Sequence, residues 1–287
     1  MFTEVHVHTL FFERAGVKVA AMSDAECALL FFGLAKEFRK TVLPSIREHI
    51  LAHNRGCDVF AHTYNVSETS NPRNSEAHQK LNVSEVFDLT SNVVMDTEDD
   101  FRRARNVAHY RKLFPHKERT WVYPTSMDNM IKQWHSIERV WHLMKSHMVA
   151  TRKVYQRVGL FRLDVLYVDK IDIASGAHAN VPLRNTLGSY MNDRLFYGTY
   201  QHAKTWATRR FSQADTYVKG TSQGRANGLH SEEFMAFLMR DVRPATQSLC
   251  FHRVRAGGQI LCDCRCSDRG TVQREHLERF MSWFRLG

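Results

Sequence analysis

Short apolar runs that alternate with helical segments are the feature that most limits how this chain can fold. Residues 28–33, ALLFFG, predict a buried strand, and residues 57–65, CDVFAHTYN, predict a second one. Between them, residues 42–56 predict a helix, because Pro44 fits a first helical turn and Gly56 can close the last one. Strand, helix and strand at this spacing indicate a βαβ unit and therefore a parallel pair of strands.

The same alternation continues to the middle of the chain. Residues 86–125 predict a third strand, a charged helix over 97–114 and a short strand at 120–124. A long amphipathic helix follows, and we interpret its apolar stripe as packing on a sheet: Met130, Trp134, Ile137, Trp141, Met144 and Met148. Buried strands between helices predict an α/β fold, with a mostly parallel Rossmann-type sheet flanked by helices.

The second half of the chain is richer in loops. Long loops are expected at 65–85, 174–191 and 212–230. The other segments predict a turn and helix at 192–211, a helix at 229–242, a strand hairpin at 249–264 and a closing helix at 272–286.

Composition limits the environment and the partners. The longest apolar stretch, Cys27–Ala35, is too short to span a bilayer and lies behind acidic residues, which is poor for a signal peptide. We therefore expect a soluble, cytoplasmic protein with no membrane span. The net charge of +10 suggests a nucleic acid, a phosphate-bearing ligand or an anionic surface as partner. Because the basic residues are dispersed along the chain, a basic surface that binds no particular partner remains an alternative.

Cysteine spacing gives a further expectation. The CDCRC segment at 262–266 places its three thiols on one face of a strand, whereas zinc sites usually use C-x2-C pairs. We expect reduced thiols and no zinc site. Two N-x-S sequons occur, at Asn65 and Asn82, and lead to no conclusion without a secretion signal.

One apolar, strand-like run, residues 158–167, carries charges in its interior. Arg162 and Asp164 are two residues apart, so a strand would project them from one face, beside Leu160 and Leu166. Burying a charge is costly unless it is paired or meets a ligand. The two residues therefore form either an internal ion pair or part of a site.

In open α/β sheets, ligands bind beyond the carboxyl ends of the strands. The sequence has no G-x-G-x-x-G, Walker or G-x-S-x-G motif, which disfavours dinucleotide redox, P-loop and α/β-hydrolase chemistry. Cations there could neutralise phosphates, and polar groups could hold a base and ribose. The candidates are Gly33, Lys36 and Arg39 after the first strand, Thr63 and Tyr64 after the second, and Gln133 on the long helix.

Carboxylates near predicted turns and helix starts could carry catalysis. Asp164 suits Mg²⁺ or Mn²⁺ bridging a diphosphate. Asp193 lies in a turn-like Asn-Asp-Arg segment. Glu232 and Glu233 follow Ser231, a suitable N-cap, so the helix dipole alone explains them; a carboxylate at a cleft can also act as a general base.

The order of these motifs carries a resemblance. The succession FFGLAKEFRKT, SIREHIL, CDVFAHTYN, IKQWHSIERVW, FRLDVLY, NDRLFYG and HSEEFM resembles the nucleotide-sugar glycosyltransferases with a GT-A-like fold that algae and chloroviruses encode. It covers nearly all the chain from about residue 28. In the viruses such enzymes build the N-glycans of the capsid protein, and xylosyl transfer is one activity of the group. The resemblance implies a nucleotide-sugar donor and an oligosaccharide or glycoprotein acceptor.

The resemblance also implies roles for residues. Most GT-A enzymes hold a divalent cation with D-x-D, but this chain reads Arg162-Leu163-Asp164 there. Either Asp164 holds Mn²⁺ or Mg²⁺, or Arg162 offsets the diphosphate charge directly. The Ser231-Glu232-Glu233 segment matches the position of the acidic motif that holds the base in inverting GT-A enzymes. The resemblance therefore implies Glu232 or Glu233 as the base, and Asp193 is the alternative. The acceptor would meet Asn192, Arg194, Tyr197 and His230.

We therefore expect a single GT-A-like domain. Residues 1–27 would form an extension, 28–167 the donor-binding half and 168–287 a loop-rich acceptor-binding half. The expected activity moves a sugar, xylose by preference, from a UDP-sugar to a glycan hydroxyl with inversion, in the cytoplasm (of the host if the protein is viral). The alternatives are a retaining transferase, a glycan-binding fold without turnover, and a basic nucleic-acid-binding protein.

Overall fold

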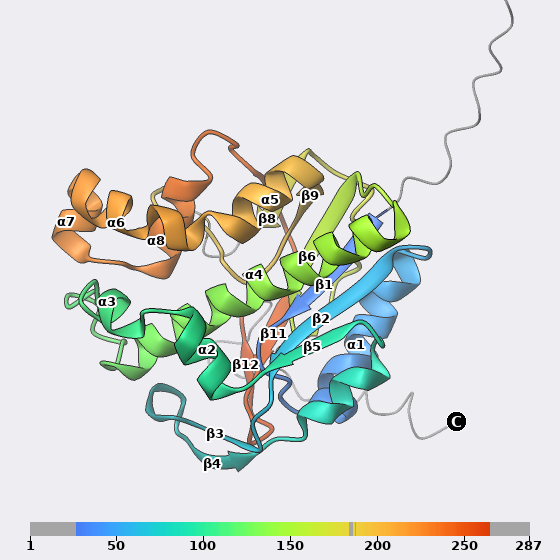
Figure 1. The fold of residues 1–287 in the computed structure, drawn as a ribbon, viewed down its shortest axis with the longest axis horizontal. Helices are drawn as coiled ribbons and strands as arrows, with labels where there is room; N and C mark the ends of the chain where they lie inside the picture. The colour runs from blue at the N-terminus through green and yellow to red at the C-terminus, as the bar shows by residue number, and fades with distance from the viewer. Residues whose placement is uncertain (1–26, 184–185, 187, 265–287) are drawn as a thin grey trace, which may run out of the picture.

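A seven-stranded sheet organises the protein (Figure 1). The computed structural model describes residues 27–183, 186 and 188–264. From one edge to the other, the strands are β10 (Ala245–Gln247), β8 (Ala179–Pro182), β9 (Phe196–Thr199), β6 (Arg157–Arg162), β1 (Cys27–Phe32), β2 (Asp58–Tyr64) and β5 (Val93–Asp96). Strand β9 is antiparallel to both of its neighbours, and the other neighbouring pairs of this sheet are parallel. The predicted α/β fold with a mostly parallel sheet is confirmed.

Helices cover both faces of this sheet. The 27-residue helix α4 (Thr125–Thr151) runs across β1, β2 and β6 (Figure 1). Alternation along β1 divides the core, since Leu30 and Phe32 pack with α4 whereas Leu29 and Phe31 pack with the opposite layer. That layer contains a π-helical turn at Phe38–Val42 and helix α1 (Leu43–His49). The predicted apolar stripe of the long helix is buried except at its end, where Met148 is half-buried.

The remaining elements complete the two layers. Single 3-10 turns lie at Leu51–His53 and Pro72–Asn74, and a six-residue 3-10 helix lies at Val83–Asp88. The other helices are α2 (Glu98–Ala104), α3 (Val107–Arg111), α5 (Tyr200–Thr208), α6 (Arg210–Gly220), α7 (Ser222–Asn227) and α8 (Ser231–Leu238). The predicted closing helix at 272–286 and the extension at 1–26 lie outside the described residues.

Two local predictions between residues 97 and 124 are wrong. The charged helix over 97–114 is two helices, because Arg105 is extended and Asn106 accepts a hydrogen bond from the His109 N–H and so caps α3. No strand forms at 120–124, where the Ser126 hydroxyl accepts from the Val122 N–H ahead of α4.

All three segments expected as loops contain regular structure. A hairpin of β3 (Glu68–Asn71) and β4 (Glu76–Lys80) occupies 65–85, strand β8 lies within 174–191, and α6 and α7 occupy most of 212–230. The predicted hairpin at 249–264 is confirmed as β11 (Phe251–Val254) paired antiparallel with β12 (Ile260–Cys262).

The charged run at 158–167 is not one strand. Strand β6 ends at Arg162, the chain turns at Leu163 and Asp164, and β7 (Val165–Tyr167) joins a second sheet in the order β12-β11-β7. Leu160 therefore packs on the α4 side while Leu166 packs on the α1 side, which corrects the prediction of a shared face.

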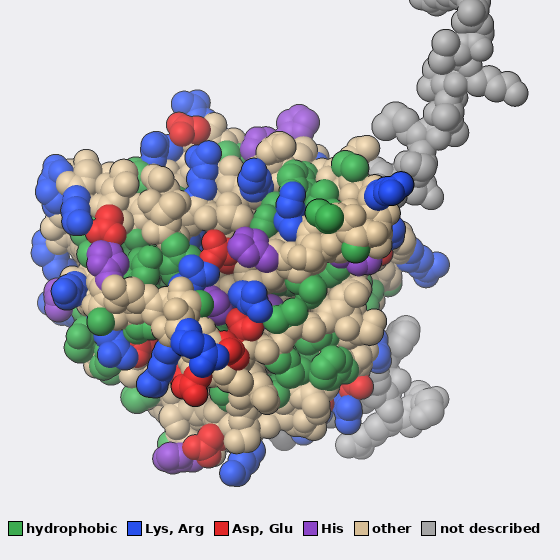
Figure 2. Space-filling view, viewed as in Figure 1, with side chains coloured by type: hydrophobic (Ala, Val, Ile, Leu, Met, Phe, Trp, Pro, Cys, Tyr) green, Lys and Arg blue, Asp and Glu red, His purple; other side chains and the backbone are tan. Residues whose placement is uncertain are grey.

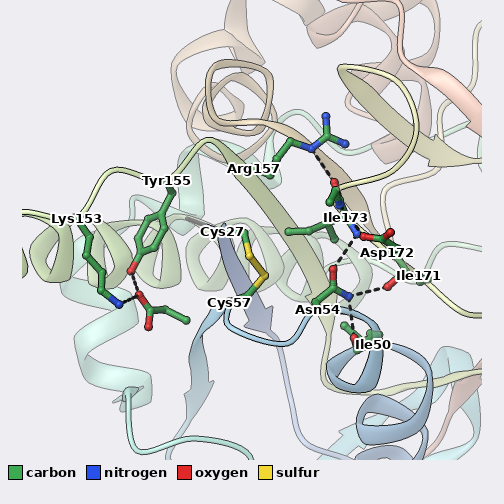
Figure 3. The surroundings of a disulfide bond; sticks show 12 residues. Cys27, Ile50, Asn54, Cys57, Lys153, Tyr155, Arg157, Ile171, Asp172 and Ile173 are labelled. Atoms are coloured by element: carbon green, nitrogen blue, oxygen red, sulfur yellow. Dashed lines mark hydrogen bonds and ion pairs between the residues drawn. A yellow bond between two sulfur atoms is a disulfide. The ribbon is translucent and has the colours of Figure 1, made fainter. Parts of the chain in front are cut away.

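Disulfide bonds replace the expected reduced thiols. Cys27 and Cys57 are bonded at the amino ends of β1 and β2 (Figure 3). Cys250 is bonded to Cys264. The first pair follows from the parallel register, in which the next residues, Ala28 and Asp58, are partners. The prediction of reduced thiols is wrong for these four residues.

A buried asparagine lies close to the Cys27–Cys57 bond. The Asn54 amide donates to the carbonyls of Ile50 and Ile171 and accepts from the Ile173 N–H (Figure 3).

Among the helices that the structure describes, none is both long enough and apolar enough to cross a membrane.

Candidate functional site

An ion pair lies just beyond the carboxyl ends of β1 and β6. Arg162 Nε and Nη2 donate to Asp164 Oδ1 and Oδ2, each at 2.7 Å, and Arg162 Nη1 donates to Gln133 Oε1 at 2.9 Å. The Arg162 carbonyl also accepts from the Tyr167 hydroxyl. The side chains of Arg162 and Asp164 are only 21% and 8% exposed, so the guanidinium is held rigidly in a site with little water.

Two further cations approach this pair. Lys36 Nζ lies 2.9 and 3.0 Å from the two carboxylate oxygens of Glu76, and the Ala256 N–H donates to Glu76 Oε1 at 2.7 Å. Arg255 is buried, and its Nε has no hydrogen-bond partner among the described residues. Burial lowers the pKa of Arg255 to about 10, with the charge of nearby Asp164 opposing that shift.

The charges in this cluster do not balance. Burial alone would raise the pKa of Asp164, but Arg162, then Lys36 and Arg255, hold it below its ordinary value. Three cations thus face the two carboxylates of Asp164 and Glu76. Without Asp193, whose charge also acts on Arg162, this group has one positive charge in excess. The excess charge and the unpartnered Arg255 N–H suit it to an anionic ligand.

A second pair of carboxylates lies next to this cluster. Gln133, which accepts from Arg162, donates through Nε2 to the Asp193 carbonyl at 3.3 Å. Asp193 Oδ2 accepts from the Ser231 hydroxyl at 2.5 Å. Glu232, the next residue, has Oε1 3.9 Å from Arg194 Nη2. Gln133 therefore connects the cationic cluster to the start of α8.

The two acids of this pair have opposite pKa shifts. Burial and the negative charge of Asp193 raise the pKa of Glu232. Burial would also raise the pKa of Asp193, but Arg194, the Ser231 hydroxyl and Arg162 outweigh it and hold the value low. Asp193 therefore stays charged, whereas Glu232, with 19% of its side chain exposed, is the better proton acceptor.

Aromatic rings border Glu232. His230 Nε2 lies 3.7 Å from Glu232 Oε2, and the His230 ring is 5.6 Å, centroid to centroid, from the rings of both Trp121 and Tyr190. Tyr190 is 45% exposed, and the Arg73 guanidinium lies 5.7 Å from the Trp121 ring. Aromatic faces beside a few polar groups are typical of ligand sites. Sequence reasoning did not identify Trp121, Tyr190 or Arg73.

Most of the sequence-predicted site residues lie in the region formed by the cationic cluster, the Asp193–Glu232 pair and the rings beside Glu232. Asn192 is buried and accepts from the Arg194 N–H through its side chain, forming the predicted turn. The Gly33 N–H donates to the Ser136 hydroxyl and so connects the end of β1 to α4. The region contains Gly33, Lys36, Gln133, Arg162, Asp164, Asn192, Asp193, Arg194, His230 and Glu232.

Five predicted residues have other surroundings. Arg39 is exposed and pairs with Asp88. Thr63 is fully buried, and the Tyr64 hydroxyl donates to the Lys132 carbonyl inside the core. Tyr197 is buried in the layer that contains α1.

Glu233 points into the helical layer. It accepts hydrogen bonds from Asn227 and Tyr217 there. The charge of Glu233 also raises the pKa of Tyr190, so Glu233 lies behind the ring that borders Glu232.

The cationic cluster does not fit a divalent cation at Asp164. Both Asp164 oxygens already accept from Arg162, and Lys36 and Arg255 add positive charge. Among the described residues, the groups of three potential ligands lie elsewhere, at His62, Asp96 and His135 and at Cys250, His252 and Cys264.

Neither of those groups favours a metal. Arg105 Nε donates to His135 Nδ1 at 3.0 Å, so the proton lies on Nε2, which donates to Asp96 at 2.8 Å. Asp96 also accepts two bonds from Arg139, and in the other group the two cysteines are bonded to each other. We interpret the buried histidines as a structural network that ties α4 to β2 and β5.

Comparison with known proteins does not identify a family. The chain matches no model of a known protein family, and no curated protein is significantly similar to it.

Proposed function

We propose that the protein is a nucleotide-sugar-dependent glycosyltransferase with a GT-A-like fold. The observation that carries the proposal is the connection between a cation-rich cluster and the Asp193–Glu232 pair through Gln133. Transfer from a nucleotide sugar needs these two parts, because one holds the diphosphate and the other activates the acceptor. The mostly parallel sheet, with the cluster beyond the carboxyl ends of β1 and β6, is consistent with this fold.

The donor diphosphate lies against Arg162, Lys36 and Arg255. Lys36 and Arg255 are buried, and Arg162 is only 21% exposed. Glu76 holds Lys36 and Asp164 holds Arg162, so these two cations need little rearrangement when negative charge develops on the leaving group. In this proposal they do the work that a divalent cation does in D-x-D enzymes. Donor binding is therefore expected to survive a chelator.

Glu232 acts as the general base. It takes the proton of an acceptor hydroxyl, whose oxygen forms a bond to the anomeric carbon as the bond from that carbon to the diphosphate oxygen breaks. Attack from the opposite side inverts the configuration. Asp193 remains ionised and fixes the Ser231 hydroxyl, while Trp121, Tyr190 and His230 line the acceptor side.

The test combines donor binding with transfer. UDP-xylose, UDP-glucose and GDP-sugars are screened by thermal shift with and without chelator; a donor at about 100 times its Kd adds about 2.7 kcal/mol of stability. Glu232→Gln should abolish transfer and preserve the shift. Glu68→Gln, a matched change in the exposed β3–β4 hairpin, should alter neither. Retention of the anomeric configuration in the product would exclude Glu232 as the general base. If no donor raised the Tm, the proposed glycosyltransferase function would be wrong.

The contacts do not favour nucleic-acid binding. On the face shown in Figure 2, Lys and Arg side chains are scattered, with Asp and Glu among them. Several arginines of the α2–α4 region are paired with acids, as in Arg103–Asp100 and Arg111–Asp128. Nucleic-acid binding that weakens steeply with salt would support that alternative instead.

A further inference from the structure

The segment between β2 and β5 carries two glycosylation sequons that the proposed function does not use. The sequons are Asn65-Val66-Ser67 and Asn82-Val83-Ser84, and both asparagines are exposed. They flank the β3–β4 hairpin (Figure 1). At the base of the hairpin the Leu81 N–H donates to the Ser67 carbonyl at 2.8 Å. Exposed N-x-S segments at the base of a hairpin are accessible to a modifying enzyme.

The second observation is the oxidised state of the cysteines. Cys27–Cys57 and Cys250–Cys264 are disulfides, and in most organisms such bonds form and persist in oxidising compartments such as the lumen of the endoplasmic reticulum. N-linked glycans are added in the same compartment. Disulfides and accessible sequons in one chain therefore point to the same route of synthesis, which differs from the expected cytoplasmic location.

The geometry favours Asn82 over Asn65. The Ser84 hydroxyl donates to Asn82 Oδ1 at 2.6 Å, which places the two functional groups of the sequon together. Val83 is buried beneath them, so the segment is anchored while the amide faces solvent. Asn82 Nδ2 makes only a long contact, 3.4 Å, to Glu85 Oε1. Asn65 instead continues β2, with its N–H bonded to the Asp96 carbonyl.

We propose that Asn82 carries an N-linked glycan. The co-substrate is an oligosaccharide joined to a lipid through a diphosphate. The Asn82 amide nitrogen forms a bond to the anomeric carbon and loses one proton, and the bond from that carbon to the diphosphate oxygen breaks, so the lipid diphosphate leaves. This inference is independent of the proposed glycosyltransferase activity.

The experiment uses the full chain with its own N-terminus, expressed in a eukaryotic cell. Intact mass is measured before and after peptide N-glycosidase, which removes N-glycans and converts the modified asparagine to aspartate. We expect the mass to fall by one glycan and a peptide map to show aspartate at position 82. A peptide map without reduction reports the two disulfides in the same sample.

Substitutions in the sequon provide the control. Asn82→Gln and Ser84→Ala should each remove this glycan, whereas Ser84→Thr, which preserves the sequon, should keep it. These side chains are exposed, so the variants should fold and keep their disulfides. An unmodified Asn82 in the full chain, modification of Asn65 alone, or loss of the glycan in Ser84→Thr would each overturn the proposal.

Discussion

Replacing Asp164 with Asn tests what the buried ion pair does. The substitution keeps the shape of the side chain and removes its charge, so Arg162, only 21% exposed, keeps no counter-charge except the more distant Asp193. Breaking a buried pair from one side costs about 3–5 kcal/mol. Two bonds of 2.7 Å are affected, and Lys36 and Arg255 also lose a nearby negative charge, which favours the upper part of that range.

Urea unfolding of the single and double variants measures this cost. For a domain of this size, 3–5 kcal/mol corresponds to a fall in Tm on the order of 10 °C. The double variant Arg162→Met with Asp164→Leu should be close to the parent in stability, because it removes both charges. A cost below about 1 kcal/mol for Asp164→Asn would refute the reasoning.

The same variant separates two interpretations of the site. If Asp164 neutralises Arg162, Asp164→Asn should tighten binding of a nucleoside diphosphate to the folded protein, because the cluster gains positive charge. If Asp164 holds a metal ion, the same change should abolish binding. Because the pKa of Asp164 is lowered in the folded state, its stabilising effect is present above the ordinary carboxyl pKa and is lost as pH falls through the folded value.

Three further outcomes are expected. Removing the Cys27–Cys57 bond by substituting both residues with Ala opens a loop of sequence separation 30 and should lower the unfolding free energy by about 3.6 kcal/mol in urea titrations; an unchanged midpoint would contradict this. Burial lowers the pKa of His135 from 6.5 to about 4, so stability should decrease as pH falls through this window, and His135→Gln should flatten the dependence seen in thermal scans at several pH values. Gly224→Ala would place a Cβ 2.2 Å from the Tyr217 carbonyl oxygen and should cost about 1–3 kcal/mol by calorimetry; a neutral result would show that α6 and α7 can separate.

The sequence predicted the strands and the long helix where apolar periodicity was strong. Residues 28–33 and 57–65 do form neighbouring parallel strands. Periodicity could not show where β6 ends, because Leu163 in the turn and Val165 after it are both apolar and buried, like the strand before them. The Cys27–Cys57 bond did have a signal, since Cys27 immediately precedes one predicted strand and Cys57 begins its predicted parallel neighbour.

The candidate site was predictable only in part. The strand-end rule selected Lys36, Arg162 and Asp164, which the fold does bring together. Glu76 and Arg255 were missed because they reach the cluster from the β3–β4 hairpin and from the loop after β11, and no local pattern marks them. Residues this far apart in the sequence are brought together only by the tertiary fold, so sequence patterns alone could not assign them to one site.

The turn at Leu163 and Asp164 has a mechanical consequence. One continuous chain passes from the large sheet into the small β12-β11-β7 sheet there, and the Arg162–Asp164 pair joins the two sides of that passage. The Val254 N–H donates to the Asp164 carbonyl at 2.8 Å, so the same turn is also bonded to β11. Amide exchange along β7 and β11 therefore reports how firmly the small sheet is joined to the large one at the edge of the site.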